Sequence, residues 1–336
     1  MRIIVDAMGG DHAPQEIVKG ALRAKKELGV EITLVGKKED ILSCLQDHEA
    51  ASVEIVDARE VITMEDEPST ATRRKKDSSM AVALRLLKEE KGDAMVSAGS
   101  TGALLTGATL TVKRIHGIRR AALAPVLPAG EHGVMLIDCG ANVECTAEYL
   151  LQFAYMGSFY AQKLMGVEVP RVGLLNVGTE DTKGGELQHR AFELLSQANA
   201  EGRICFVGNV EGTGVFSGEA DVVVTDGFTG NVLLKTTEGV IKYMMKALKN
   251  VFYASTMNKL AAAVLKSDLA QMKKSMDVNE VGGTALIGIS KPVIKAHGSS
   301  NEASFFSAIR QAKQFAESGI ISDIAAHIDV MRIRTE

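Results

Sequence analysis

Five turns of this sequence place glycine, hydroxyl, amide and carboxylate groups directly after short apolar strands. A helical pattern follows each turn, so main-chain N–H groups there lack an intrahelical partner and the helix dipole favours negative charge. One such turn means little, but five in one chain predict a cleft that binds an anionic group. The five segments are IIVDAMGGDHAP from Ile3, VSAGSTGA from Val96, LIDCGAN from Leu136, NVGTEDTKGG from Asn176 and VVVTDGFTGN from Val222.

These turns hold and position an anion but offer no obvious covalent nucleophile. The sequence has no G-x-x-x-x-G-K-[ST] loop, which argues against ATP hydrolysis, and no G-x-G-x-x-G after its first strand, so a Rossmann dinucleotide site is not supported. G-x-S-x-G and H-E-x-x-H are also absent. A reaction in which phosphate itself attacks a bound electrophile would need only a phosphate cradle, donors for a developing oxyanion and at most one base.

Composition indicates an α/β enzyme. The chain has 336 residues, 46% hydrophobic and 24% charged, which is enough for one large unit or two lobes. Aromatic residues make up only 4%, Trp is absent and Gly reaches 32, which suits a turn-rich α/β protein better than a β-sandwich. A net charge of −4 gives no general attraction to nucleic acid, so no nucleic-acid partner is expected.

Cysteine usage and hydropathy indicate a cytoplasmic protein. The four cysteines form no C-x-x-C pair, so neither a zinc site nor a disulfide framework is predicted. Asp6 interrupts the first apolar run, which argues against a signal peptide. No stretch approaches the roughly 20 apolar residues that a membrane span requires.

Short apolar strands alternate with amphipathic helices along the chain. This pattern predicts a mostly parallel sheet covered on both faces, with ligands bound at the carboxyl ends of the strands. Strands are expected at Ile3–Asp6, Ile32–Val35, Val53–Val56, Ala94–Ser97, Val134–Asp138, Val172–Asn176, Ile204–Val207 and Val222–Thr225. Helices are expected at Ala13–Leu28, Lys38–Leu45, Ser78–Glu90, Gly102–Lys113, Ala147–Met165, Glu186–Gln197 and Asn231–Leu248.

A Met- and Lys-rich segment at residues 242–278 predicts an amphipathic helical arm. Between Lys242 and Met276 there are seven lysines and one acid, Asp268. Such an arm can pack in a dimer, lie in a membrane interface or remain a plain surface helix. The apolar residues at helical spacing are Leu260, Val264, Leu265, Leu269, Met272 and Met276, and we assign the first four to membrane contact.

Four consecutive cations, Arg73, Arg74, Lys75 and Lys76, precede a predicted helix start at Asp77 or Ser78. Such a cluster is either a solvated face or a site for an acidic partner or a phosphorylated prosthetic arm.

Six segments together are similar to the bacterial phosphate acyltransferases, the PlsX family. The resemblance extends from Ile3 to about Ile328. The segments are DAMGGDHAP, SAGSTGALLTGA, LIDCGAN, NVGTEDTKG, VVVTDGFTGNVLLKTTEG and KAHGSSN.

The resemblance implies a fold like that of isopropylmalate dehydrogenase and phosphotransacetylase, with two α/β lobes around a cleft in one catalytic unit, residues 1–336, and a homodimer. It also implies transfer of a long-chain fatty acyl group from acyl carrier protein to inorganic phosphate, without a cofactor. The acyl phosphate would pass to a membrane glycerol-3-phosphate acyltransferase for phospholipid synthesis. Family members are cytoplasmic and associate peripherally with the membrane.

Three residues are the predicted catalytic set. Lys183 is the turn cation expected to neutralise the anion, or else a solvated loop lysine. Asn142 could donate to phosphate or to the thioester oxygen, or be an ordinary turn residue. Asp226 could orient phosphate or act as a base, or only cap its helix.

Cys139 is expected to be a buried structural thiol, and an Asp6/Asp11 metal pair is an alternative that the residue types allow. The remaining site residues come from four turns. Phosphate is expected at Ser100, Thr101, Gly102, Thr229, Gly230 and Asn231, beside a first turn of Asp6, Gly9, Gly10, Asp11 and His12 and a late turn with His297 and Asn301.

Three alternative functions stay open at this point. They are a soluble phosphotransacetylase that uses acyl-CoA, a decarboxylating dehydrogenase of the same broad fold, and a membrane-surface scaffold without enzymatic activity.

Overall fold

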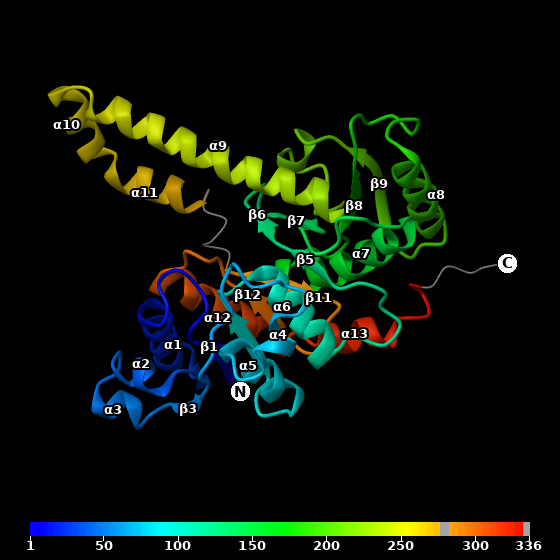
Figure 1. Cartoon of the computed structure of the whole chain (residues 1–336). Helices are drawn as coiled ribbons and strands as arrows, with labels where there is room; N and C mark the ends of the chain where they lie inside the picture. The colour runs from blue at the N-terminus through cyan, green and yellow to red at the C-terminus, as the bar shows by residue number, and fades with distance from the viewer. Residues whose placement is uncertain (276–281, 332–336) are drawn as a thin grey trace.

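The computed structural model describes residues 1–275 and 282–331 and contains two β-sheets with helices packed against them (Figure 1). The first sheet has the strand order β3-β2-β1-β4-β12-β11-β5, and its first five strands are parallel. β11 pairs antiparallel with β12, and the edge strand β5 pairs antiparallel with β11. Its strands are β1 (Arg2–Asp6), β2 (Glu31–Gly36), β3 (Glu54–Asp57), β4 (Ala94–Ser97), β5 (Ala122–Ala124), β11 (Thr284–Ile287) and β12 (Val293–Lys295).

The second sheet has the order β6-β7-β10-β8-β9, and only its edge strand β6 is antiparallel. Pro125 alone separates β5 from β6, so the chain passes directly from the first sheet into the second. The strands are β6 (Val126–Leu127), β7 (Val134–Ile137), β8 (Arg171–Leu175), β9 (Cys205–Val210) and β10 (Val222–Val224).

Helices cover both faces of the first sheet, as its continuous apolar strands predict. Ile3 and Val5 of β1 belong to the core that includes α1 and α12, whereas Ile4 belongs to the core that includes α5. These helices and their neighbours are α1 (Gln15–Leu28), α2 (Lys38–Leu42), α3 (Asp47–Ala50), α4 (Ala71–Arg74), α5 (Ser79–Lys88), α6 (Thr101–Gly107), which continues as a π-helical turn (Ala108–Val112), α12 (Glu302–Glu317) and α13 (Ile320–Ala326).

The second sheet is covered by α7 (Ala147–Tyr160) and α8 (Glu186–Ala200). The core on this side is continuous with that of the first sheet, because Phe153 of α7 and Phe305 of α12 belong to one cluster of buried side chains. A π-helical turn (Ala161–Met165) extends α7, and a 3-10 turn (Gly214–Phe216) precedes β10.

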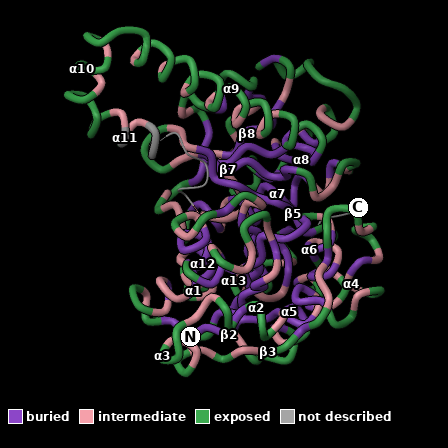
Figure 2. The backbone as a smooth tube through the Cα atoms, turned by 60° about the vertical axis from the view of Figure 1, so that its left-hand side comes forward, coloured by how far each residue is buried: buried purple, intermediate pink, exposed green. Residues whose placement is uncertain are grey.

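A helical arm projects from the second sheet (Figure 1). It consists of α9 (Gly227–Tyr253), α10 (Thr256–Val264) and α11 (Lys266–Ser275). Figure 2 shows that exposed and half-buried residues dominate it, in contrast to the buried strands below. Val264 is 81% exposed and Leu260 61%. No helix among the described residues is long and apolar enough to cross a membrane. Residues 276–278 of the predicted arm lie outside the described residues.

The structure confirms the predicted α/β class with mostly parallel sheets and a protruding arm. All eight predicted strands exist, with ends displaced by at most three residues. The predicted helix Asn231–Leu248 is too short at both ends, since α9 begins at Gly227 and ends at Tyr253. The elements that were not predicted from the sequence are α3, α4, β5, β6, β11, β12, α12 and α13.

Candidate active site

Three turns that are far apart in the sequence meet at one edge of the first sheet. β1, β4 and β12 are parallel neighbours, so the segments that follow them lie side by side. The Asp11 N–H donates to the Gly298 carbonyl at 2.8 Å, which joins the first turn to the turn after β12. A Cβ atom on Gly9 would lie 2.6 Å from the Gly99 nitrogen, so glycine is required for this close approach.

The Asp6 carboxylate stabilises the first turn through hydrogen bonds. Its side chain is buried and accepts hydrogen bonds from Ser97 Oγ at 2.6 Å and from the Met8 N–H at 3.3 Å. Burial raises the pKa of this carboxyl above its ordinary value. Asp11 and His12 are exposed. The described residues contain no group of three His, Cys, Asp or Glu side chains placed to hold a metal ion.

A cavity of about 340 Å³ lies where the two sheets meet. Lys295, Ala296 and His297 from the end of β12, together with Thr101 at the start of α6, line its first-sheet side. Leu123, Pro125 and Val126, where the chain crosses between the sheets, add an apolar wall. The second-sheet side consists of Cys139, Gly140, Asn231, Leu234, Lys235 and Glu238.

Lys295 is the main cationic group of this cavity. Its residue is only 8% exposed, and its ammonium donates to the carbonyls of Ala98, at 3.4 Å, and Ala296. Burial lowers the pKa of Lys295 to about 8, against the opposing attraction of Asp6 and Asp11. A lysine that lies in a cavity and whose pKa is strongly lowered is typical of a functional site.

Two further titratable groups face the same cavity. Lys235 of α9 is exposed and forms an ion pair with Glu238 one turn later, at 2.9 Å. His297 is half-buried, and burial lowers the pKa of its imidazole. Its Nδ1 lies 2.8 Å from Ser299 Oγ. The cavity therefore brings together two lysines, one carboxylate and an imidazole, next to apolar side chains.

The comparison with known proteins decides the family. The model of a family described as "Fatty acid synthesis protein" matches residues 1–323. The phosphate acyltransferase of Oceanobacillus iheyensis is 49% identical over 330 residues, covering 98% of each chain. That of Desulfitobacterium hafniense is 50% identical over 326 residues, covering 96% of each. The chain belongs to the phosphate acyltransferase family. It is an acyltransferase of the family that serves fatty acid and phospholipid synthesis.

Solved structures of lower identity share the fold. A phosphotransacetylase from Streptococcus pyogenes has a TM-score of 0.62 at 18% identity, and the match covers 94% of each chain. A putative 4-hydroxythreonine-4-phosphate dehydrogenase from Salmonella typhimurium has a TM-score of 0.53 at 14% identity, covering 94% of this chain and 99% of the other. The predicted likeness to phosphotransacetylases and to dehydrogenases is therefore confirmed at the level of the fold.

In this family member, the turn after β7 supports the start of α9. Asp138 is buried and accepts hydrogen bonds from the N–H groups of Leu123 and Asn142. The Asn142 side-chain amide donates to Asp138 at 3.0 Å and to the Ala121 carbonyl at 2.8 Å, so both of its hydrogens are engaged within the protein. Burial raises the pKa of Asp138.

Glycines allow α9 to sit directly on this turn. A Cβ atom on Gly230 would lie 1.9 Å from the Asp138 carbonyl oxygen, and one on Gly227 would lie 2.6 Å from the Asn142 carbonyl oxygen. Asp226 caps the helix, because its carboxylate accepts from the Thr229 N–H at 2.9 Å and from Thr229 Oγ1 at 2.7 Å. The predicted alternative of a capping aspartate is thus the arrangement that the structure shows.

Lys183 does not line the cavity between the sheets. It is exposed in the loop between β8 and α8, and its Nζ lies 3.9 Å from Glu180. The adjacent Gly184 and Gly185, with Thr229, line a separate cavity of about 580 Å³ on the opposite face of α9. Asn301 caps α12 by accepting the Ser304 N–H at 3.0 Å, and it does not line the first cavity either.

Among the residues predicted from sequence, Thr101, Asn231 and His297 line the cavity between the sheets. Ser100 is buried beside Thr101 and Gly102 lies in the first turn of α6. Gly9, Gly10 and Asp11 pack the first turn against the turns after β4 and β12. Cys139 lines the cavity too, but burial raises the pKa of its thiol well above the ordinary value, which disfavours the nucleophilic thiolate.

Three residues of the cavity, Lys295, Lys235 and Glu238, were not predicted from the sequence. The signal for Lys295 was available, since it directly follows the apolar run PVI and lysine is almost never buried without a reason. Lys235 and Glu238 lay within the expected helix Asn231–Leu248, where their spacing alone resembled an ordinary surface ion pair.

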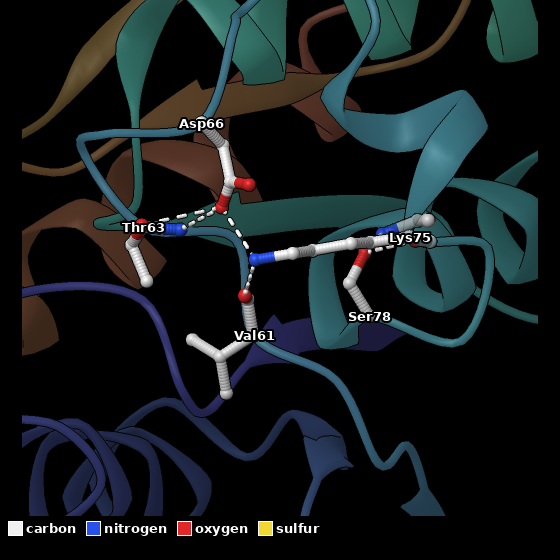
Figure 3. Close-up of polar contacts among 6 residues, drawn as sticks. Val61, Thr63, Asp66, Lys75 and Ser78 are labelled. Atoms are coloured by element: carbon white, nitrogen blue, oxygen red, sulfur yellow. Dashed lines mark hydrogen bonds and ion pairs between the residues drawn. The ribbon is translucent and has the colours of Figure 1, made fainter.

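The basic cluster before α5 divides into one structural lysine and three exposed cations. Lys75 Nζ donates to the Val61 carbonyl at 2.8 Å and pairs with Asp66 at 2.6 Å, which fixes the loop that also contains Thr63 (Figure 3). Its hydrogen bond lowers the pKa of Asp66. Ser78 caps α5, as predicted. Arg73, Arg74 and Lys76 are exposed.

Proposed function

We propose that this acyltransferase moves a long-chain fatty acyl group from acyl carrier protein to inorganic phosphate by direct attack of phosphate on the thioester. The observation that carries the proposal is the cavity between the sheets, where Lys295 and Lys235 lie next to the apolar side chains of Leu123, Val126 and Leu234. Two cations suit a phosphate nucleophile, and the apolar wall suits the start of a fatty acyl chain. Cys139, the thiol in this cavity, is held protonated by burial.

The reaction balances without a covalent enzyme intermediate. A phosphate oxygen forms a bond to the thioester carbonyl carbon, the carbonyl oxygen carries the negative charge of the tetrahedral species, and the carbon–sulfur bond then breaks. The thiolate of the carrier's prosthetic group leaves and takes up, through solvent, the proton that the attacking hydrogen phosphate loses. Phosphate is already anionic near neutral pH, so the protein contributes positioning and electrostatic stabilisation, with Thr101, Asn231 and His297 as further donors on the cavity wall.

The other predicted site residues keep supporting roles in this proposal. Asn142 and Asp226 hold the start of α9, and with it Asn231 and Lys235, against the second sheet. Lys183 would meet the carrier's prosthetic group or the acyl donor at the outer face of α9, because it lies in the loop whose glycines line the second cavity. Both sheets would act as one catalytic unit.

The partners follow from charge and exposed apolar surface. Acyl carrier protein is acidic, and Arg73, Arg74 and Lys76 present three exposed cations to it. The arm carries exposed Leu260, Val264 and Leu265, half-buried Leu269 and several lysines, a combination that favours contact with an anionic bilayer or with a second subunit. We propose a cytoplasmic homodimer that associates peripherally with the membrane and passes acyl phosphate to a membrane glycerol-3-phosphate acyltransferase.

Hydroxylamine trapping tests the choice of donor. The purified chain is incubated with inorganic phosphate and either palmitoyl-acyl carrier protein or acetyl-CoA, without ATP or added metal. Phosphate-dependent acyl hydroxamate from the carrier-bound substrate supports the proposal. Product from acetyl-CoA alone would instead identify a phosphotransacetylase of short acyl-CoA, and NAD-dependent turnover with Mg²⁺ would identify a dehydrogenase.

A further inference from the structure

Lys295 is a buried cation whose described contacts do not neutralise its charge. Its two hydrogen-bond partners are the main-chain carbonyls of Ala98 and Ala296. Asp6 and Asp11 attract it only through space, and it forms no hydrogen bond with a carboxylate of the described residues. An ammonium group has three N–H donors, so one donor remains after the two carbonyls are satisfied.

The remaining N–H donor can bind a ligand, because Lys295 lines the cavity of about 340 Å³. Burying an unpaired charge is costly, and an anion in the cavity would supply the missing partner. We propose that Lys295 is the anchor for a tetrahedral oxyanion in this cavity, and that oxyanion binding above neutral pH is accompanied by uptake of a proton onto this lysine. The inference rests on the proposed function, in which that oxyanion is the attacking phosphate.

Linkage fixes the direction of the effect. With a pKa of about 8, the free Lys295 is mostly charged below pH 8 and mostly neutral above it. A bound dianion favours the ammonium, so the pKa of Lys295 rises in the complex. Between the two pKa values, binding must therefore take up a proton, and oxyanion affinity must fall as pH rises, by up to about tenfold per pH unit.

The charged groups that face Lys295 do not produce the same signature. Asp6, on β1, accepts a hydrogen bond from Ser97 Oγ at 2.6 Å, and Asp11, in the turn after β1, is exposed. Lys235 and Glu238 of α9 form an ion pair with each other at 2.9 Å. Burial lowers the pKa of His297, the remaining imidazole of the cavity, so it is neutral at pH 8 to 9.

Calorimetric titration of the full chain with sulfate tests the inference. Sulfate is a dianion throughout this pH range, so its own ionisation does not contribute. Titrations at pH 7 and pH 8.5, each in two buffers of different ionisation enthalpy, give the number of protons taken up. We expect little uptake at pH 7, a substantial fraction of one proton at pH 8.5, and a matching loss of affinity between pH 8 and pH 9.5.

Two variants and one control assign the proton. Lys295→Met should weaken sulfate binding at least tenfold at pH 7 and abolish the uptake. Lys295→Arg keeps a permanent cation, so binding should persist without proton uptake and with a flat pH profile. Lys246→Met is the matched control, because it removes an exposed lysine of α9 that does not line the cavity, and it should retain both the affinity and the uptake.

Wild-type binding without proton uptake at pH 8.5, or unchanged uptake in Lys295→Met, would overturn the inference. Acyl phosphate formation by the same wild-type preparation separates this result from a failure of the proposed function. An active enzyme without proton-linked binding would contradict only the role of Lys295. An inactive enzyme with proton-linked binding would contradict the acyl transfer and leave the oxyanion anchor in place.

Discussion

The buried ammonium group of Lys295 destabilises the folded protein but places a cation in the cavity. Its pKa of about 8 in the folded protein lies below the ordinary value of 10.5, so the folded state binds the proton more weakly than the unfolded state. The loss of folding stability is therefore complete below pH 8 and is relieved as pH rises toward 10.5. A difference of this size corresponds to roughly 3 kcal/mol.

Lys295→Met should therefore stabilise the protein at pH 7 while weakening oxyanion binding. The expected gain is about 2 to 3 kcal/mol, because a similar volume remains and the buried charge is removed. Thermal unfolding at pH 7 and pH 9.5 measures it, and the advantage of the variant should shrink at the higher pH. A variant that melts below the wild type at pH 7 would show that the ammonium is a structural requirement.

The basic residues before α5 differ in what they do. Lys75 fixes the loop at Asp66, whereas Arg73 and Arg74 are exposed, so substitutions should separate binding from folding. The double change Arg73→Glu and Arg74→Glu should raise the KM for acyl carrier protein severalfold, more strongly at low salt, and leave the melting temperature nearly unchanged.

Lys75→Met is the contrasting variant for this cluster. It should lower the melting temperature, because the Val61 carbonyl and the Asp66 carboxylate lose their shared donor. Steady-state kinetics with purified acyl carrier protein, together with thermal melts, measures both effects. An unchanged KM in the double variant would remove Arg73 and Arg74 from the carrier-binding surface.

At the scale of elements, the start of α9 is the most constrained contact. Gly230 leaves no room for a side chain against the Asp138 carbonyl, whereas a Cβ atom on Gly239 of the same helix would meet nothing within 4 Å. Gly230→Ala should destabilise the protein by about 2 to 4 kcal/mol and displace Lys235 from the cavity. Gly239→Ala should stabilise α9 by about 0.5 to 1 kcal/mol.

Chemical denaturation of both glycine variants, combined with the acyl phosphate assay, checks this pair. The expected result is reduced stability and activity in Gly230→Ala and intact activity in Gly239→Ala. Equal stability of the two variants would mean that α9 does not depend on close contact with the Asp138 turn.

Local patterns predicted the elements whose signals are local. β1 and β4 were predicted from continuous apolar runs, and α1 from the amphipathic stretch Ala13–Leu28, of which fourteen residues form the helix. β12 was missed because it is three residues long and acquires its strand partner, β4, from about two hundred residues earlier in the chain. No local pattern encodes that pairing, and it is this pairing that places Lys295 next to Ala98.

Only the part of the site that has a local sequence signal was predicted. The turns after β1 and β4 were predicted as anion-binding segments and the late turn with His297 as part of the cleft, and the structure brings the three turns together. Lys183 was the predicted cation because it lies among glycine and threonine, where a turn lysine is expected to meet a ligand. Burial, which separates a solvated lysine from one held in a cavity, depends on the packing of both sheets.

At the scale of the whole molecule, one helix, α9, contributes both to the cavity and to the exposed arm. α9 lines the cavity with Leu234 and Lys235 and then continues into the projecting hairpin. The double change Leu260→Ser and Val264→Ser should reduce co-flotation with anionic phospholipid vesicles at least fivefold, because both apolar side chains are exposed. Acyl phosphate formation without membranes should remain, and undiminished flotation would remove the arm from membrane contact.

The central claim is direct attack of phosphate on the thioester, and a single-turnover experiment tests it most directly. The enzyme, in excess over radiolabelled palmitoyl-acyl carrier protein, is first kept free of phosphate and then mixed with it. The account predicts no release of carrier thiol and no labelled enzyme before phosphate is added, followed by simultaneous appearance of thiol and acyl phosphate. A stoichiometric burst of thiol with label bound covalently to the enzyme, before phosphate is present, would contradict it.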